Sequence, residues 1–334
     1  MRPIPYLLFF LLFSCTKPMR SQQIGDDFAK GADVGWITEM EQQGVLFYSD
    51  KGKQMEGMSL LKSLGMNTIR LRIWVNPAEK WNGRADVIAK ALRARELGMR
   101  IMLNFHYSDN WADPGKQFKP ATWASLSFPE LKQTLVQYTL EVLREFKAAG
   151  IDPEWVQVGN ETDDGLLWPD GKASRSMASY AALIDAGYGA VKEVFPSAKV
   201  IAHVSNGWNN ELFRWNIGGL IANGARFDVI GLSLYPTAAN WRALTKQCMD
   251  NVQDMITRYG KETMIVEVGM PWDQPDAAHA FLSELILRAR AIENEKCSGV
   301  LYWEPQAHNN WKGYTLGAFN NQGRPTKALQ AFAN

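Results

Sequence analysis

Two arginines alternate with apolar residues in Thr68-Ile69-Arg70-Leu71-Arg72-Ile73-Trp74, a segment with the length and β-branched content of a strand. Successive side chains of a strand point to opposite faces, so Arg70 and Arg72 share one face. The same one-sided polarity recurs in three further segments, at Asn104 and His106, at Gln157 and Glu161, and at Ser233 and Tyr235. Strands of an open sheet covered by helices are apolar on both faces. A barrel whose interior opens into a site accommodates the pattern better.

Eight strands are predicted along the chain, over residues 28–35, 68–74, 100–106, 155–161, 199–205, 229–236, 263–269 and 299–305. The clearest helix between them opens with the capping box Ser127-Phe128-Pro129-Glu130 and ends at Gly150. Further helices are predicted over residues 55–64, 84–97, 176–195, 241–259 and 276–294. The strand count alone leaves a doubly wound sheet open. Together with the one-sided polarity it predicts an α/β fold, a single (β/α)8 TIM barrel, in residues 27–334.

The composition excludes partners that are recognised by charge. The chain has 334 residues, of which 46% are hydrophobic, so a large core can form. Thirty-six Lys and Arg against 35 Asp and Glu give a net charge of +1, which offers no attraction to nucleic acid or to an anionic membrane. The unusual feature is the presence of 13 Trp, a residue that often provides a flat contact surface.

Residues 1–14 have the pattern of a bacterial lipoprotein signal peptide. Arg2 precedes an apolar run over residues 7–13 that is too short to span a bilayer. The run ends in Leu12-Phe13-Ser14-Cys15, which resembles a lipoprotein cleavage site with Cys15 as the lipidated first residue; the alternative is a buried strand with a chance cysteine. Residues 15–26 would form a tether. The prediction is a secreted lipoprotein of a bacterial outer membrane, held there only through its lipid anchor, with the face of that membrane left open.

Two glutamates end predicted strands and should meet at one mouth of the barrel. Glu161 ends the fourth strand, and Glu267 lies within the apolar run Ile265-Val266-Glu267-Val268 of the seventh. A carboxylate in such a run is costly to bury unless it is paired or functional. Two carboxyls facing one pocket are what cleavage of a glycosidic bond requires. The structural alternative is a pair of buried ion pairs with Arg70 or Arg72.

Five blocks of sequence resemble glycoside hydrolase family 53, the arabinogalactan endo-β-1,4-galactanases. They are Gly31-Ala32-Asp33-Val34-Gly35-Trp36, the segment from Thr68 to Pro77, the segment from Asn104 to Gln117, Gln157-Val158-Gly159-Asn160-Glu161, and Tyr302-Trp303-Glu304-Pro305. The similarity spans nearly the whole mature chain. It implies an endo-acting enzyme that cleaves β-1,4-galactosidic bonds in galactan or arabinogalactan with retention of configuration. The alternatives are a related glycosidase acting on another β-1,4-glycan and a non-catalytic glycan-binding lipoprotein.

The resemblance assigns the two glutamates their roles. Glu161 is expected to be the general acid/base and Glu267 the nucleophile, with carboxyls about 5 to 5.5 Å apart as in retaining enzymes. Asn160 is expected to bind the sugar 2-hydroxyl, unless it merely caps the turn that follows its strand. Arg70 matches the arginine that holds the nucleophile ionised, although Arg72 shares its face and the assignment could slip by two residues.

Further site residues follow from the same comparison. Tyr235 can donate its hydroxyl to Glu267 or simply pack at the mouth of the barrel. His106 should lie beside the cleaved sugar, and Asp109, in the same block, is expected to bind substrate. His203 is interpreted as a core residue with satisfied hydrogen bonds, because that is the commoner state of a lone histidine in a strand.

The tryptophans divide between the cleft and the core. Trp303 is the candidate floor for the sugar at the cleavage point, and the long loop 107–126 carries Trp111 and Trp123 on a functional rim. Four more follow strands and could extend the cleft: Trp74, Trp208, Trp272 and Trp311. Three are expected to pack in the core or on outer helices: Trp81, Trp155 and Trp215.

No metal or cofactor is expected. Some bacterial members of the family carry calcium after the seventh strand, but Met270-Pro271-Trp272-Asp273-Gln274-Pro275-Asp276 holds only two isolated Asp there. Cys248 and Cys297 are interpreted as packing residues, without a disulfide. The protein is expected to be a monomer.

Overall fold

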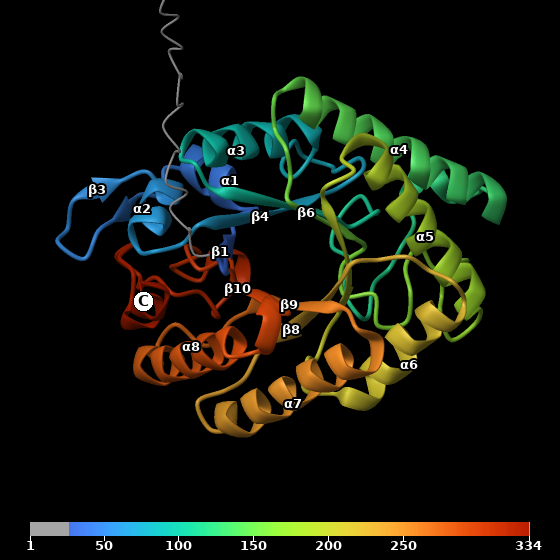
Figure 1. Ribbon diagram of the computed structural model, residues 1–334. Helices are drawn as coiled ribbons and strands as arrows, with labels where there is room; N and C mark the ends of the chain where they lie inside the picture. Colours follow the sequence, from blue (N-terminus) through green and yellow to red (C-terminus); the bar gives the residue numbers. More distant parts are fainter. Residues whose placement is uncertain (1–26, 334) are drawn as a thin grey trace, which may run out of the picture.

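The computed structural model describes residues 27–333, and within them the predicted barrel is confirmed. Eight parallel strands close it in the order β1-β10-β9-β8-β7-β6-β5-β4, with β1 paired to β4 (Figure 1). Their bounds are β1 Ala29–Asp33, β4 Thr68–Ile73, β5 Arg100–Phe105, β6 Trp155–Val158, β7 Lys199–Val204, β8 Val229–Leu234, β9 Glu262–Val268 and β10 Cys297–Trp303. The predicted signal peptide, Cys15 and the whole predicted tether lie outside the described residues.

A ring of helices surrounds the barrel (Figure 1). It comprises α1 Ile37–Gln42, α2 Gly57–Ser63, α3 Arg84–Glu96, α4 Phe128–Ala148, α5 Met177–Val194, α6 Asn210–Ala222, α7 Trp241–Tyr259 and α8 Pro275–Arg290. Short elements complete it: β2 Phe47–Tyr48, β3 Gln54–Met55, η1 Ala121–Trp123, η2 Glu293–Glu295, η3 Trp311–Gly313 and η4 Lys327–Phe332. The 3₁₀ segment η4 packs on α8 and takes the place of a last α-helix after β10.

Local signals account for one helix and fail for another. At the start of α4, Glu130 accepts hydrogen bonds from the backbone N–H and the hydroxyl of Ser127, as the capping box predicts. No helix is predicted over α6, whose Gly218-Gly219 pair disfavours helix. The glycines are there for packing: a Cβ on Gly218 would lie 2.7 Å from the Tyr259 hydroxyl, and one on Gly219 would lie 2.5 Å from the Met177 side chain. Tertiary contacts therefore override propensity in α6.

The inside of the barrel is divided into an apolar and a polar part. Apolar side chains form a small separate core that includes Ala29, Met102, Trp155, Val229, Met264 and Leu301. The expected packing role of Trp155 is thus confirmed. Polar side chains, all buried, follow toward the strand ends: Asp33, Arg70, Arg72, Asn104, Gln157, His203, Ser233 and Glu267. This division explains the one-sided polarity of the strands and places the polar groups at the carboxyl ends, where sites of such barrels lie.

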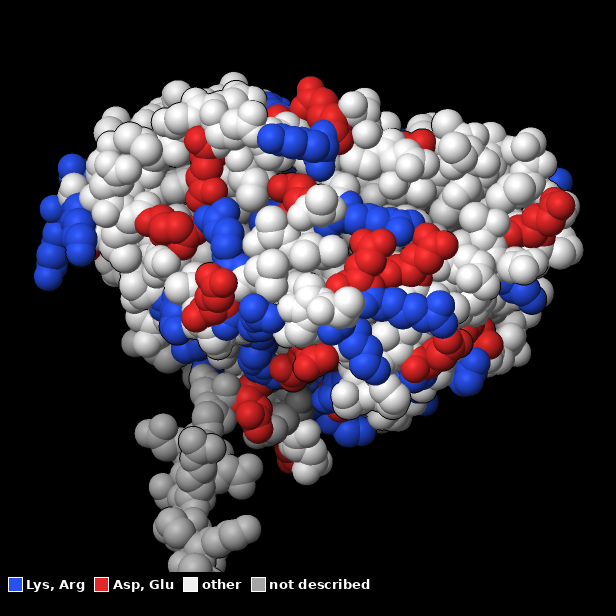
Figure 2. All heavy atoms as spheres, turned by 90° about the horizontal axis from the view of Figure 1, so that it is seen from above, with Lys and Arg blue, Asp and Glu red and all other residues white. Residues whose placement is uncertain are grey.

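Charges of both signs interleave over the face shown in Figure 2, without a patch of one sign. Exposed charges of the described chain form ion pairs such as Arg144–Glu193 and Lys246–Asp250. Among residues 27–333, no helix is both long and apolar enough to cross a bilayer. Cys248 and Cys297 are buried free thiols and are not joined in a disulfide, in agreement with their predicted packing role.

Candidate active site

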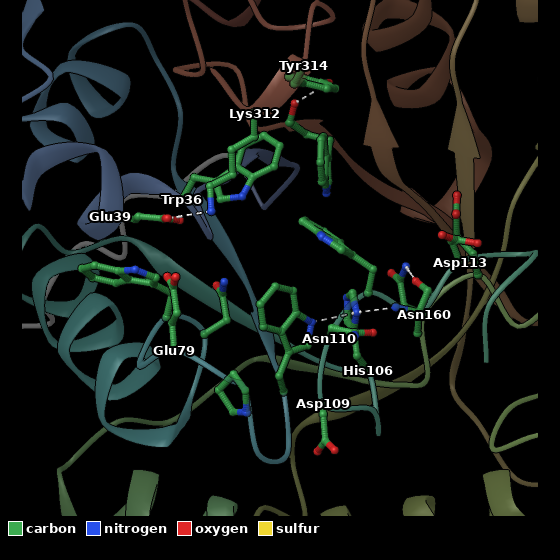
Figure 3. Close-up of a pocket in the computed structure, with 18 of the residues that line it drawn as sticks. Trp36, Glu39, Glu79, His106, Asp109, Asn110, Asp113, Asn160, Lys312 and Tyr314 are labelled. Atoms are coloured by element: carbon green, nitrogen blue, oxygen red, sulfur yellow. Dashed lines mark hydrogen bonds and ion pairs between the residues drawn. The ribbon is translucent and has the colours of Figure 1, made fainter. Parts of the chain in front are cut away.

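A cavity of about 950 Å³ opens at the carboxyl ends of the strands (Figure 3). Both candidate catalytic glutamates line it, together with six of the other predicted site residues: Asn160, His106, Asp109, Tyr235, Trp303 and Trp111. Arg70, the remaining one, is fully buried beneath the cavity. The barrel therefore brings the predicted side chains from six different strands, and from the loops after them, to one place.

Glu267 is held in place from two sides. Nη1 of Arg70 lies 2.8 Å from Oε1 of Glu267, and the Tyr235 hydroxyl donates to Oε2 at 2.8 Å. The open choice between the two arginines is thereby settled. Arg72 instead pairs with Glu304, and both arginines pair with Asp33, Arg70 at 2.8 Å and Arg72 at 3.2 Å.

Glu161 has different partners. It follows β6 in a tight turn, with φ values of +85° at Gly159 and +45° at Glu161 itself. The second value is unusual for a residue with a side chain and marks local strain at this position. The Ser233 hydroxyl donates to Oε1 of Glu161 at 2.7 Å. Within residues 27–333, Glu161 forms no salt bridge.

These environments separate the two carboxyls in proton affinity. Burial and the negative charge of Glu267 raise the pKa of Glu161 well above its ordinary value. Burial also raises the pKa of Glu267, but the Arg70 cation and the Tyr235 hydroxyl oppose that rise. Glu161 is therefore the carboxyl that retains a proton, and Glu267 is the one that ionises first.

Asn160 is part of the floor of the site. Its Oδ1 accepts hydrogen bonds from Arg70 at 2.8 Å and from Asn104 at 3.0 Å, and its Nδ2 donates to the carbonyl of Ala112 at 2.8 Å. These bonds run to other strands and to the loop after β5, so Asn160 does more than cap its own turn. An amide nitrogen has two hydrogens, so one N–H of Asn160 is left for a ligand in the cavity.

His106 presents a neutral N–H to the cavity. Its Nδ1 accepts from the backbone N–H of Ala112 at 3.1 Å and from the indole N–H of Trp74 at 3.3 Å, so the ring proton belongs on Nε2 (Figure 3). Burial and the cations Arg72 and Arg70 lower the pKa of His106 well below its ordinary value. His106 is therefore a hydrogen-bond donor without charge.

Aromatic rings form one wall of the cavity. The Trp303 ring lies 5.1 Å from Trp36 and 4.7 Å from Tyr314, both edge to face, and Trp111 lies 5.8 Å from Trp303. The guanidinium of Arg72 lies 4.5 Å from the centre of the Trp111 ring. The buried cation and the edge contacts fix these rings before any ligand binds.

Other aromatic predictions are corrected. Trp81, which was expected to pack, lines the cavity, whereas Trp74 lines it as predicted. Trp123 is buried against Tyr138 and is not part of a rim. Three tryptophans expected in the cleft do not line this cavity: Trp208, Trp272 and Trp311. Trp215 on α6 is 44% exposed.

Asp109 lines the cavity but its carboxylate is occupied by the protein. Its Oδ1 accepts from the backbone N–H of Asn76 at 2.9 Å and its Oδ2 from that of Ala121 at 2.8 Å. The side chain thus ties the loop after β4 to the loop after β5.

A family model described as glycosyl hydrolase family 53 matches residues 29–280. The chain belongs to this family. It is 31% identical over 331 residues to an arabinogalactan endo-β-1,4-galactanase of Humicola insolens, covering 91% of this chain and 98% of the relative. Among solved structures, that of a fungal β-1,4-galactanase has a TM-score of 0.84 at 28% identity, covering 91% of this chain and 98% of the other. The family 53 catalytic domain of Ignisphaera aggregans also has a TM-score of 0.84 at 28% identity, with 93% and 97% covered.

The family 53 barrel holds site residues that the sequence reasoning missed. His203 is fully buried, as expected, but its partners are the backbone N–H of Glu161 at 3.2 Å and the hydroxyl of Ser233 at 2.8 Å. Glu304 is buried beside Arg72 and accepts from the N–H of Trp36; burial raises its pKa to about 7, against the effect of Arg72. The polar strand faces at Gln157 and Ser233 were the sequence signal that could have revealed the contact between His203 and Ser233.

Contacts within the protein brace the loop after β9 in this family 53 chain. The N–H of Trp272 donates to the carbonyl of Thr315 at 3.0 Å, and Asp276 pairs with Lys327 at 2.7 Å. No cluster of three or more His, Cys, Asp or Glu able to hold a metal ion occurs in the described part of the chain. The absence of calcium stays a prediction.

Proposed function

We propose that this protein is an endo-acting galactanase that hydrolyses β-1,4-galactosidic bonds in galactan or arabinogalactan with retention of configuration. One observation carries the proposal: the cavity holds one carboxyl that retains its proton, Glu161, and one that is paired with a cation, Glu267. The relatives named arabinogalactan endo-β-1,4-galactanase support the choice of substrate.

The first chemical step uses both carboxyls. Glu267 attacks the anomeric carbon and forms a covalent galactosyl ester while the bond to the leaving oxygen breaks. Glu161 gives its proton to that oxygen, so the shortened chain leaves as an alcohol. Arg70 and Tyr235 hold Glu267 in the ionised form that the attack requires. Asn160 and His106 offer N–H donors at the wall of the cavity, where sugar hydroxyls would lie.

The second step reverses the roles of Glu161. Now ionised, it takes a proton from a water molecule, whose oxygen attacks the anomeric carbon and releases Glu267. Two displacements at the same carbon restore the β configuration. The ester no longer carries the charge of Glu267 that raised the pKa of Glu161, so that pKa falls once the ester forms and Glu161 ionises, as its role as the base requires.

The shape and chemistry of the cavity suit a neutral polymer. Five tryptophans line it and provide flat faces for the C–H surfaces of galactose: Trp36, Trp74, Trp81, Trp111 and Trp303. Endo action is supported by the relatives named arabinogalactan endo-β-1,4-galactanase.

The test is to incubate the protein with linear β-1,4-galactan, mannan, glucan and xylan and to follow products over time. We expect mixed oligomers from galactan only, with the β anomer of the new reducing end appearing first in ¹H NMR spectra. Stepwise release of galactose, or cleavage of mannan instead, would overturn the substrate assignment. Initial appearance of the α anomer would overturn retention.

We also propose that Cys15 is lipidated and anchors the protein to a bacterial outer membrane, on the strength of the Leu12-Phe13-Ser14-Cys15 pattern. Mass spectrometry of the mature N-terminal peptide tests this. A diacylglyceryl group on Cys15, lost in a Cys15→Ser variant, is expected. Cleavage at another site, or an unmodified Cys15, would refute the anchor.

A further inference from the structure

A chain of hydrogen bonds connects Arg70 to Glu161 beneath the cavity. The Oε1 of Gln157 accepts from Nε and Nη2 of Arg70 at 3.2 and 3.1 Å. The Nε2 of Gln157 lies 2.8 Å from Nδ1 of His203, and Nε2 of His203 lies 2.8 Å from the Ser233 hydroxyl. That hydroxyl in turn lies 2.7 Å from Oε1 of Glu161. The chain therefore crosses four strands, from β4 through β6 and β7 to β8.

The direction of every bond in this chain is fixed by groups that can only donate. The arginine guanidinium has no acceptor, so the Gln157 amide must turn its oxygen to Arg70 and its NH2 to His203. The backbone N–H of Glu161, also an obligatory donor, points at the same Nδ1 from 3.2 Å. Nδ1 is therefore an acceptor, and the neutral ring carries its proton on Nε2.

The consequence reaches the carboxyl of Glu161. Because Nε2–H of His203 donates to the Ser233 oxygen, the Ser233 O–H is free to donate onward to Oε1 of Glu161. Gln157, His203 and Ser233 are at most 1% exposed, so water does not compete for these bonds. Oε1 is thus always an acceptor.

We propose that His203 and Ser233 are positioning residues for the acid/base: they orient its carboxyl and confine the transferable proton to Oε2. This rests on the proposed glycosidase function, in which Glu161 is the acid. The series of hydrogen bonds starts at Arg70, which also pairs with Glu267, so the same buried network orients both carboxyls. The carboxyl therefore carries its proton on the same oxygen, Oε2, before each transfer.

The surrounding charges agree with a neutral His203. Burial, then Arg70 and His106, lower the pKa of His203 well below its ordinary value. Protonation would also place an N–H on Nδ1 against two other donors. The charges that act on Glu161 itself are Glu267 and Asp163, which raise its pKa, and Arg70, which lowers it; the hydrogen bond from Ser233 also lowers it.

The first test is the pH profile of a Ser233→Ala variant on galactan. The alkaline limb of kcat/KM reports the ionisation of the acid in the free enzyme. Loss of a bond donated to the carboxylate should move that limb upward by about 1 pH unit, and kcat should fall. Ser233→Thr, which keeps the hydroxyl, should restore the wild-type limb.

The matched control is Thr139→Val in α4, whose buried hydroxyl bonds to Tyr107 and to the carbonyl of Leu135. It should lower thermal stability without moving the limb. An alkaline limb that stays in place in an active Ser233→Ala variant would overturn the proposal.

A second measurement needs no variant at position 233. ¹⁵N NMR spectra of histidine-labelled protein report the tautomer of each of the four histidines, assigned with His106→Gln, His279→Gln and His308→Gln variants. We expect His203 to be neutral with its proton on Nε2 across the pH range of activity. An Nδ1–H tautomer or an imidazolium would refute the proposed order of hydrogen bonds from Arg70 to Glu161. A wild type that cleaves no galactan would instead refute the proposed function, whatever the tautomer.

Discussion

The guanidinium of Arg70 lies 2.8 Å from the carboxylate of Glu267, and both side chains are almost completely buried. Removing a buried charge from its partner leaves the other uncompensated, so the pair keeps Glu267 ionised. Glu161 has a hydroxyl where Glu267 has a cation. This difference in partners, more than any difference in burial, gives the two glutamates of one cavity different proton affinities.

Replacing each glutamate by alanine should produce distinct defects. Glu161→Ala should lower galactan turnover by about 10²- to 10⁴-fold, because protonation of the leaving oxygen is lost. It should retain the first step on a dinitrophenyl β-galactobioside, whose leaving group needs no proton. Added azide should then give the β-galactosyl azide. Glu267→Ala should hydrolyse neither substrate, and with added azide it should convert the dinitrophenyl glycoside to the α-azide. The reverse distribution of products would exchange the two assignments.

Tyr235→Phe removes one hydrogen bond to the nucleophile and keeps the ring. Bonds to charged groups are stronger than neutral ones, so kcat should fall by about 10- to 100-fold. Steady-state kinetics on galactan give the measurement. Tyr188→Phe on α5, where the ring lies under Arg226 away from the cavity, is the control and should be neutral. Equal kinetics for both variants would mean that the Tyr235 hydroxyl only packs at the barrel mouth.

Asp163→Asn should shift the pH profile in the direction opposite to Ser233→Ala. The negative charge of Asp163 raises the pKa of Glu161, so its removal lowers that pKa. The acid then ionises earlier as the pH rises, and the alkaline limb of kcat/KM moves to lower pH. Asparagine can keep both bonds to Ser205: its amide oxygen can accept from the backbone N–H of Ser205, and its NH2 can donate to the Ser205 hydroxyl. An upward shift would contradict the sign of this interaction.

Trp81 should contribute to the binding of long chains. It lines the cavity, so Trp81→Ala should raise KM for polymeric galactan and leave the hydrolysis of a short aryl galactobioside unchanged. Trp215→Ala on the outer face of the barrel removes an equally large and more exposed ring, and should change neither value. If Trp81→Ala resembles this control, the sugar chain does not extend along that part of the cavity.

Calcium should not be bound in stoichiometric amount. The loop after β9 is tied to its neighbours by a backbone bond from Trp272 and by the pair of Asp276 with Lys327. Elemental analysis of protein purified without chelator measures the metal content. One calcium per chain, with a drop in the melting temperature on treatment with chelator, would contradict the prediction.

Several parts of the site depend on contacts between distant residues, and the sequence alone could not supply them. Arg70 and Arg72 share one face of β4, so periodicity cannot distinguish them. Strand register places Arg70 level with Asp33 and Arg72 level with Asn104. Both guanidinium groups pair with Asp33, but only Arg70 reaches Glu267 and only Arg72 reaches Glu304. The partner that fixes the role of His203 is Ser233, which lies 30 residues away in the sequence. Whether Trp81 packs or lines the cavity depends on where its loop lies in the folded protein.

The sequence by itself determined the (β/α)8 order, the capping of α4 and the placement of Glu161 and Glu267 at strand ends, because strand periodicity and helix signals are local. Only the tertiary structure decided which arginine holds Glu267, where α6 forms around its paired glycines, and how the chain through His203 and Ser233 reaches Glu161. The reason is physical: these outcomes depend on the register and closure of the barrel, which set the height of each inward side chain and hence its partners.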